Sequence, residues 1–217
     1  GRSYGLINNI EEIKHLVDGY ITANGAYCFS GKQEISCCPI PMNQVTSVIE
    51  LSDKMGFACI IGWEQDIMMY NNNPTADHIF KDMLNVQNLR ESTSLQTILG
   101  QRILQLTPVV TPTEEQAILP LLNNVVSSRW CPEFIDITAK GVDKAKGMKD
   151  MITWYGFPLS QTVAFGDGGN DLPMIREAGI GVVMGNASQT VKDAADHVTN
   201  SVDDDGIYQA LKYLKVI

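Results

Sequence analysis

The chain has 217 residues, 44% of them hydrophobic and 19% charged, which is typical of a globular protein with one large domain or two small ones. Its formal net charge of −9 argues against nucleic acid as the main partner, because binding a polyanion requires a concentrated basic surface. No apolar run reaches the roughly 18 residues of a membrane span, so no membrane partner is expected. The five cysteines form no C-x-x-C pair, which favours reduced thiols in a cytoplasmic protein over a disulfide framework or a zinc site.

The first predicted element is a short apolar strand at residues 19–23, which we expect to be buried and parallel to its neighbours. A middle region with a different pattern follows, from about residue 41 to residue 132. Its hydrophobic spacing predicts helices over 43–55, 75–86 and 113–126, and strands near 58–63, 67–70, 103–107 and 133–137.

The last third of the chain alternates helices with further buried parallel strands. A helix is predicted over 144–155, strands over 162–165 and 180–184, and a closing helix over 206–216. Between the two strands we expect a short helix, which Asn170 or Asp171 can cap and which ends at Gly179.

Together these elements predict an α/β protein with a Rossmann-like, three-layer parallel-sheet core. We expect residues 1–40 and 138–217 to form this core, and residues 41–137 to form a second α/β module inserted between its two halves.

An acidic glycine turn, F-G-D-G-G-N-D at residues 165–171, carries the strongest chemical signal. It follows a predicted strand, at the sheet edge where ligands of open α/β sheets bind. Asp167 and Asp171 offer the hard oxygen donors that Mg²⁺ prefers. A dinucleotide loop is the first alternative, but the third fingerprint glycine is absent and acids would repel a pyrophosphate. A calcium loop lacks the later ligands that it needs, and a purely structural turn is the third alternative.

Lys144 provides a second signal, at the start of the helix that precedes the acidic turn. A lysine in this place contributes a point charge for a phosphoryl group and a carboxylate. Surface lysines are common, so Lys144 alone discriminates poorly, and we expect Lys146 and Lys149 to be solvated.

Several motifs in fixed order resemble those of Cof-type haloacid dehalogenase-like phosphatases. They are I-T-A-N-G-A (21–26), D-x-T-x-K-G-x-x-K-x-x-G (136–147), F-G-D-G-G-N-D-x-x-M (165–174), A-x-I-G-V-x-M-G-N-A (178–187), V-K-x-A-A-D (191–196) and D-x-D-G-I (203–207). The resemblance covers the whole chain and is most specific in residues 136–207. The segment R-W-x-P-x-F-x-D (129–136) is similar to that of bacterial sugar-phosphate phosphatases in this group.

The resemblance implies a role for each matched residue. Lys144 holds the phosphate and neutralises the nucleophile, Asp167 is the acidic metal ligand, and Asp171 is a second acid that supports the Mg²⁺ shell. Asn170 contacts the phosphoryl group and Asn24 faces the cleft. The inserted module is then a mobile type IIB cap.

Further residues are expected to contact the substrate. Gly1 and Arg2 match the Gly-Arg that follows a hydroxyl residue at the phosphate site of the family. Arg129 and Trp130 are candidates for contacts with a sugar. The alternative is that Trp130 belongs to the core and Arg129 is a solvated neighbour.

The family's D-x-D-G-T motif, whose first Asp attacks phosphorus and whose second protonates the leaving group, does not occur at a strand end in the sequence as given. A covalent phosphatase requires this nucleophile. We therefore expect an N-terminal segment with the motif to precede Gly1.

The leading hypothesis is a Mg²⁺-dependent phosphatase of small phosphorylated metabolites, foremost sugar phosphates, which acts through an aspartyl-phosphate as a monomer or weak homodimer. A module that binds phosphate and metal without turnover is the second hypothesis. A phosphomutase that requires a sugar bisphosphate is the third.

Overall fold

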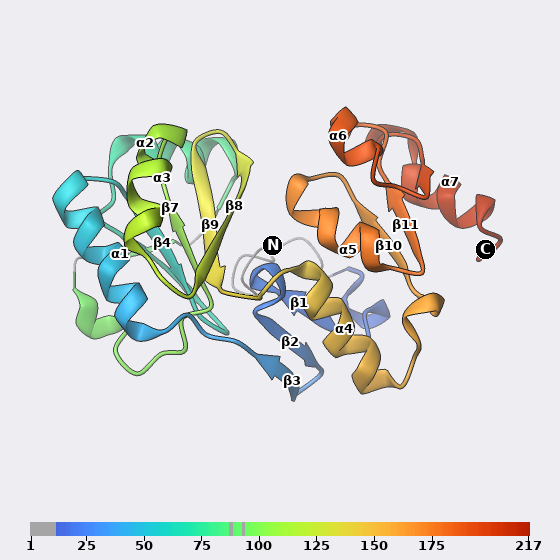
Figure 1. Cartoon of the computed structure of the whole chain (residues 1–217), viewed down its shortest axis with the longest axis horizontal. Helices are drawn as coiled ribbons and strands as arrows, with labels where there is room; N and C mark the ends of the chain where they lie inside the picture. Colours follow the sequence, from blue (N-terminus) through green and yellow to red (C-terminus); the bar gives the residue numbers. More distant parts are fainter. Residues whose placement is uncertain (1–11, 87–88, 93) are drawn as a thin grey trace. The chain divides into compact units, whose positions relative to one another are not determined.

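The computed structural model describes residues 12–86, 89–92 and 94–217, and the chain divides into two compact units, Gly1–Val142 and Asp143–Ile217. Each unit mixes helices with strands, and the predicted α/β class is confirmed (Figure 1). The predicted division into a core (1–40, 138–217) and an inserted cap (41–137) stays a prediction. None of the described helices is both long enough and apolar enough to cross a bilayer.

The larger sheet of the first unit has six strands in the order β6-β5-β4-β7-β9-β8. They are β4 (Cys59–Gly62), β5 (Ile67–Tyr70), β6 (Arg90–Ser92), β7 (Gln105–Pro108), β8 (Val125–Cys131) and β9 (Phe134–Ala139). Only β5 and β6 run parallel, and the other neighbours are antiparallel. Every residue of β4, β5 and β7 is buried, as expected for central strands covered on both faces.

Two apolar clusters cover the two faces of this sheet. Because successive strand residues point to opposite faces, Ile61 packs with helix α1 (Met42–Met55) and helix α3 (Pro112–Ile118). Its neighbour Ile60 packs instead with the segment formed by α2 (Pro74–Asp77) and a π-helical turn over His78–Met83. The side chains of β4, β7 and β9 are therefore divided between two distinct environments.

Two strands of this sheet, β6 and β8, were not predicted from the sequence. The helix predicted over 113–126 is wrong in its second half, because α3 and a following 3-10 turn end at Leu121 and β8 begins at Val125. Pro120 lies within the 3-10 turn, and Asn124 has a positive φ of 57°. Both features stop a helix.

The strand predicted over 19–23 exists but is not a buried parallel strand. β1 (Tyr20–Thr22) pairs antiparallel with β2 (Tyr27–Ser30), which pairs antiparallel with β3 (Gln33–Cys37). The chain reverses through Ala23, Asn24 and Gly25, which all have positive φ. Asn and Gly adopt this left-handed backbone more easily than other residues do, so the turn forms a hairpin.

The second unit contains a parallel sheet in the order β10-β11-β12. Its strands are β10 (Val163–Gly166), β11 (Ile180–Val183) and β12 (His197–Val198), and its helices are α4 (Lys144–Tyr155), α5 (Leu172–Glu177), α6 (Gln189–Lys192) and α7 (Gly206–Tyr213). The helix predicted over 144–155 is confirmed. Asp143 caps its first turn by accepting from the backbone N–H of Lys146, and Gly156 ends it in the left-handed conformation.

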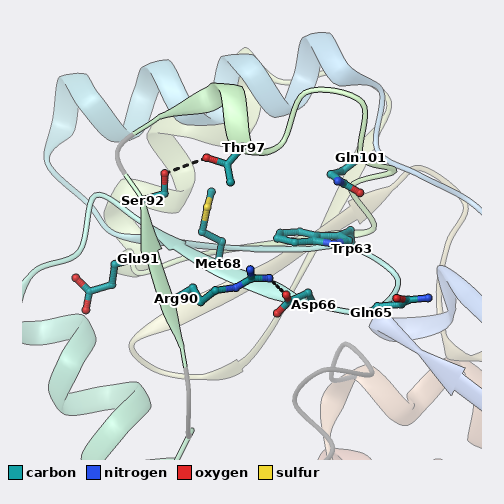
Figure 2. Close-up of a pocket in the computed structure, with 9 residues that line it drawn as sticks. All are labelled: Trp63, Gln65, Asp66, Met68, Arg90, Glu91, Ser92, Thr97 and Gln101. Atoms are coloured by element: carbon teal, nitrogen blue, oxygen red, sulfur yellow. Dashed lines mark hydrogen bonds and ion pairs between the residues drawn. The ribbon is translucent and has the colours of Figure 1, made fainter.

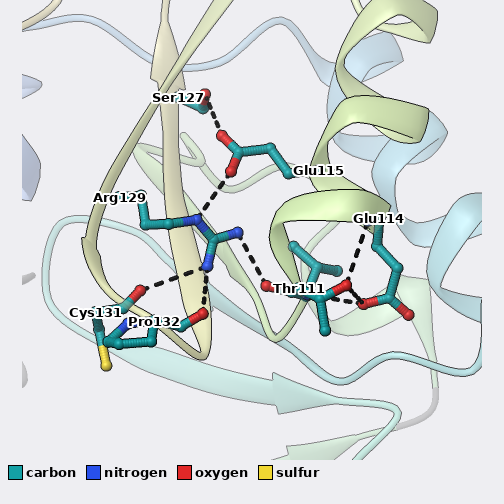
Figure 3. A network of polar contacts seen from close by, with 8 residues as sticks. Thr111, Glu114, Glu115, Ser127, Arg129, Cys131 and Pro132 are labelled. Atoms are coloured by element: carbon teal, nitrogen blue, oxygen red, sulfur yellow. Dashed lines mark hydrogen bonds and ion pairs between the residues drawn. The ribbon is translucent and has the colours of Figure 1, made fainter.

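The capping box of α3 supplies a test of the fold. Thr111 accepts from the Glu114 backbone N–H at 3.3 Å, and the Glu114 carboxylate accepts from the Thr111 backbone N–H at 2.7 Å (Figure 3). Thr111→Ala removes the first bond and should lower the free energy of unfolding by about 1 kcal/mol. Thr113→Ala, the same change two residues later, should alter it by less than about 0.5 kcal/mol. Equal losses in denaturant unfolding of the two variants would contradict the assigned start of α3.

Candidate active site

The acidic turn follows the carboxyl end of β10, as predicted. β10 and β11 are paired in parallel register from Val163 opposite Ile180 to Gly166 opposite Val183. The loop that follows each strand therefore lies at the same edge of the sheet, where ligands of parallel sheets bind.

Asp171 is the organising residue of this turn and is only 5% exposed. One carboxylate oxygen forms an ion pair with Lys144 at the start of α4. The other accepts hydrogen bonds from the backbone N–H groups of Asp167 at 3.0 Å and Gly168 at 2.9 Å. The carboxylate therefore fixes the turn and the lysine at the same time.

The pKa of Asp171 lies below that of an ordinary aspartate. Burial alone would raise this pKa, but the charge of Lys144 and the hydrogen bonds from Lys144 and from the backbone of Gly168 and Asp167 outweigh it. Asp171 is consequently ionised at neutral pH, and it holds the Lys144 ammonium beside the turn.

Glycine is required at Gly166 because the turn closes tightly over Asp171. A Cβ at residue 166 would lie 2.5 Å from the Asp171 Cβ, and a Cβ at residue 168 would lie 2.8 Å from the Asn170 Oδ1. Residue 169 has open space around it instead. The glycines of the motif thus have different functions, and Gly166 provides the close approach.

Asp167 is exposed at the mouth of the turn. The Asn186 side chain donates to its Oδ2 at 3.1 Å and accepts from the Val202 backbone N–H at 3.2 Å. Asn186 was not predicted as a site residue, although its place in the G-N-A loop directly after β11 was a usable signal. The adjoining Asn170 is half-buried in the same turn.

The carboxylate oxygens of this turn can supply part of the coordination shell of a Mg²⁺ ion. Among the described residues, the Asp167 carboxylate accepts only from Asn186 and retains oxygen lone pairs for a cation, whereas both oxygens of Asp171 are already engaged. Over the described ranges no group of three or more His, Cys, Asp or Glu residues is arranged to hold a metal ion. Mg²⁺ commonly uses one or two carboxylates together with water and substrate phosphate, so Asp167 and Asp171 fit this chemistry, and their assignment as metal residues stays a prediction.

Arg129, in the first unit, has its guanidinium occupied by protein groups (Figure 3). It donates to the Glu115 carboxylate at 2.9 Å, to the Val110 carbonyl at 3.0 Å and to the Pro132 carbonyl at 2.6 Å. Ser127 donates to the other Glu115 oxygen at 3.0 Å. These hydrogen bonds connect β8 with α3. The predicted contact between Arg129 and a substrate stays a prediction.

Trp130 and Asn24 meet at Asp136 on β9, which belongs to two of the sequence motifs but was assigned no role from the sequence. The Trp130 indole N–H and the Asn24 amide donate to the same Asp136 oxygen at 3.0 and 3.1 Å. The predicted site residues therefore fall into two groups, with Lys144, Asp167, Asn170 and Asp171 in the second unit. Gly1 and Arg2 lie outside the described residues.

A cavity of about 500 Å³ lies in the first unit beside β5 and β6 (Figure 2). Trp63, Met68 and Thr97 line it, and Arg90 and Asp66 on its border form an ion pair with each other. Because this pair neutralises the arginine, the cavity offers a phosphate no unpaired cation among its lining residues.

Comparison with known proteins agrees with this geometry. A profile of haloacid dehalogenase-like hydrolases matches residues 1–211, and the chain belongs to that family. A solved structure described as the haloacid dehalogenase subclass IIB sugar phosphatase BT4131 is 41% identical, with a TM-score of 0.92 over 100% of this chain and 84% of that one. The predicted Cof-type resemblance with a type IIB cap is thereby confirmed.

Two curated relatives come from Bacillus subtilis. The putative phosphatase YkrA is 33% identical over 222 residues, which cover 100% of this chain and 83% of YkrA. The 5-amino-6-(5-phospho-D-ribitylamino)uracil phosphatase YitU is 25% identical over 226 residues, which cover 98% of this chain and 82% of YitU.

Two of the three glycines of the turn, Gly166 and Gly169, provide a matched test of the site. Gly166→Ala places a methyl group against the Asp171 side chain, and should lower the free energy of unfolding by about 2 kcal/mol or more. Gly169→Ala, into open space, should change it by less than about 1 kcal/mol. Chemical denaturation of the two variants measures the difference, and a harmless Gly166→Ala would show that the turn does not close over Asp171 as described.

Proposed function

We propose that this chain belongs to a Mg²⁺-dependent phosphatase that hydrolyses sugar phosphates. The observation that carries the proposal is the Lys144–Asp171 pair beside Asp167 and Asn170, at the carboxyl end of β10. Its family, which is shown by the match over residues 1–211, supplies the reaction class of a phosphoric monoester hydrolase.

The charge balance of this turn supports a requirement for a divalent cation. Lys144 is already paired with Asp171, and Asp167 adds a further carboxylate, so these three side chains together carry one net negative charge. A phosphate dianion would be repelled by such a site. A divalent cation at Asp167 reverses the sign of the local charge, and when bound it neutralises the phosphoryl oxygens during transfer.

The protein side chains would position the phosphoryl group. Lys144 supplies a positive charge whose position is fixed by its ion pair with Asp171. Asn170, in the same turn as Asp171, supplies an amide donor. Phosphoryl transfer depends mainly on positioning and charge neutralisation, so preorganised donors contribute without rearrangement during the reaction.

The covalent part of the proposal rests on the resemblance to Cof-type phosphatases. In that family an aspartate carboxylate attacks phosphorus, and the ester bond to the sugar oxygen breaks. A second aspartate gives its proton to the departing alcohol. Water then hydrolyses the aspartyl-phosphate and releases inorganic phosphate.

Sugar phosphates are the preferred substrate class for two reasons. The structure described as a sugar phosphatase is 41% identical to this chain over its whole length. In addition, Trp130 presents a partly exposed indole ring, and such a ring suits the apolar face of a sugar.

Phosphate release by the full-length natural protein tests the proposal. With Mg²⁺ and a panel of hexose phosphates we expect hydrolysis, which chelation of the metal abolishes. Lys144→Met should lower kcat/KM about 100-fold or more, because a preorganised charge at the phosphoryl group is lost. Lys149→Met is the matched control: Lys149 lies on the same helix as Lys144 and forms an exposed ion pair with Glu177 of α5, and its loss should change kcat/KM by less than about twofold.

Two results would contradict the proposal. The first is an absence of phosphate release by the wild-type protein with Mg²⁺ across the panel. If such a protein still bound inorganic phosphate in calorimetry, the hypothesis of a binding module without turnover would replace the phosphatase. The second is full activity of Lys144→Met, which would remove the lysine from the site.

A further inference from the structure

Asp136 is a buried carboxylate whose recorded partners are all neutral donors. It is 3% exposed. One oxygen accepts from the Trp130 indole at 3.0 Å and from the Asn24 amide at 3.1 Å. The other accepts from the Gln105 amide at 2.7 Å and from the Thr107 hydroxyl at 2.8 Å. Since a carboxylate has about four lone-pair positions, these bonds saturate Asp136, and it has no position left for a substrate.

Such a group is costly to bury. A carboxylate in a protein interior requires compensation, and neutral donors compensate it less well than a cation does. Apolar residues surround the cluster, including Phe134 and Ile60 on the same face of the sheet. Stability alone therefore does not explain why a carboxylate is buried at residue 136.

The partner with an exposed surface is Trp130. A β-bulge in β8, between Ser128 and Cys131, places two residues opposite one on β9, and such irregularities re-aim side chains. The Trp130 ring meets Phe134 edge-on, with a centroid distance of 4.9 Å and an interplanar angle of 85°, and Phe134 is itself fully buried. Trp130 nevertheless remains 41% exposed, so its ring is anchored at the N–H and against Phe134 while much of its surface stays open.

Gln105 supplies a second, independent observation. Its Nε2 donates to Asp136 and Thr107, which fixes the orientation of the amide. Its Oε1 is buried and has no hydrogen-bond partner in the described part of the chain. An unsatisfied buried acceptor is costly, so the cluster around Asp136 is not explained by stability alone.

From these contacts we propose that Asp136 is a positioning residue that fixes the Trp130 ring as a platform for a neutral sugar ring. The inference rests on the proposed function and names the group that would set its preference for sugars. The indole face stacks on the C–H face of a pyranose, while the negative charge of Asp136 disfavours an anionic group at the same place. Trp130 thus recognises a neutral ring that bears hydroxyl groups.

A kinetic comparison in the full-length protein tests this role. Asp136→Asn replaces one acceptor oxygen with a donor, so two of the four hydrogen bonds are lost. We expect KM for a hexose phosphate to rise about tenfold, as for loss of hydrogen bonds to a charged group. The kcat for this substrate, and both constants for acetyl phosphate, which has no ring, should stay within about twofold. Asp53→Asn is the matched control, because Asp53 accepts from the Tyr70 hydroxyl elsewhere in the same unit.

A double-mutant cycle separates positioning from mere support of the fold. If Asp136 acts through Trp130, Asp136→Asn should add no further rise in KM once Trp130→Ala is present. Additive effects, or equal losses with hexose phosphate and acetyl phosphate, would overturn the inference. Should Asp136→Asn fail to fold, Trp130→Phe keeps a ring but lacks the N–H, and it should raise KM for the hexose phosphate selectively.

A binding measurement distinguishes failure of this inference from failure of the proposed function. An unphosphorylated hexose should quench the tryptophan fluorescence of the wild-type protein saturably, without any turnover. Asp136→Asn should require about tenfold more hexose for half-saturation. If hydrolysis is absent but quenching behaves as expected, the phosphatase fails and the sugar platform stands. If phosphatase activity is present and quenching is absent, the platform is wrong.

Discussion

The Asp171 carboxylate connects the parts of the acidic turn in the second unit. It pairs with Lys144, which lies 27 positions earlier in the chain, and it accepts from two backbone N–H groups of its own turn. A glycine at residue 166 is required because the backbone passes directly beside this side chain. The position of the lysine, the shape of the turn and the exposure of Asp167 all depend on this single carboxylate.

A second buried carboxylate has a different kind of environment. Asp171 has a cationic partner, so its charge is locally balanced, whereas the described donors to Asp136 in the first unit are all neutral. In the proposed function the first arrangement would serve metal and phosphate, because one divalent cation would make the turn attractive to an anion. The second arrangement suits uncharged hydroxyl groups. Each unit therefore contains one buried carboxylate, and the two carboxylates differ in the charge of their partners.

The sequence predicted what depends on local pattern. The α4 helix, the β10–β11 pair and the turn that carries Asp167 could be predicted from helical spacing, caps and apolar runs. The antiparallel pairing of β1 could not, because an apolar run does not specify the direction of its neighbour. β8 was missed because its residues are only partly buried and lack a continuous apolar signal. Asp136 was assigned no role for a related reason, because its donors lie between 6 and 112 positions away. Pairing of β9 with β7 and β8 brings Gln105, Thr107 and Trp130 close to it, and Asn24 comes from the turn after β1.

The pKa of Asp171 is the most direct measure of the central interaction, and a carboxyl NMR titration of the folded protein provides it. The described contacts predict a pKa below the ordinary aspartate value of about 3.9, and an upward shift in Lys144→Met, since burial then acts without the compensating cation. Because the folded-state pKa is depressed, the stabilisation is fully present above the ordinary value and is lost as pH falls through the lower one. A pKa at or above the ordinary value that does not respond to loss of Lys144 would contradict the account.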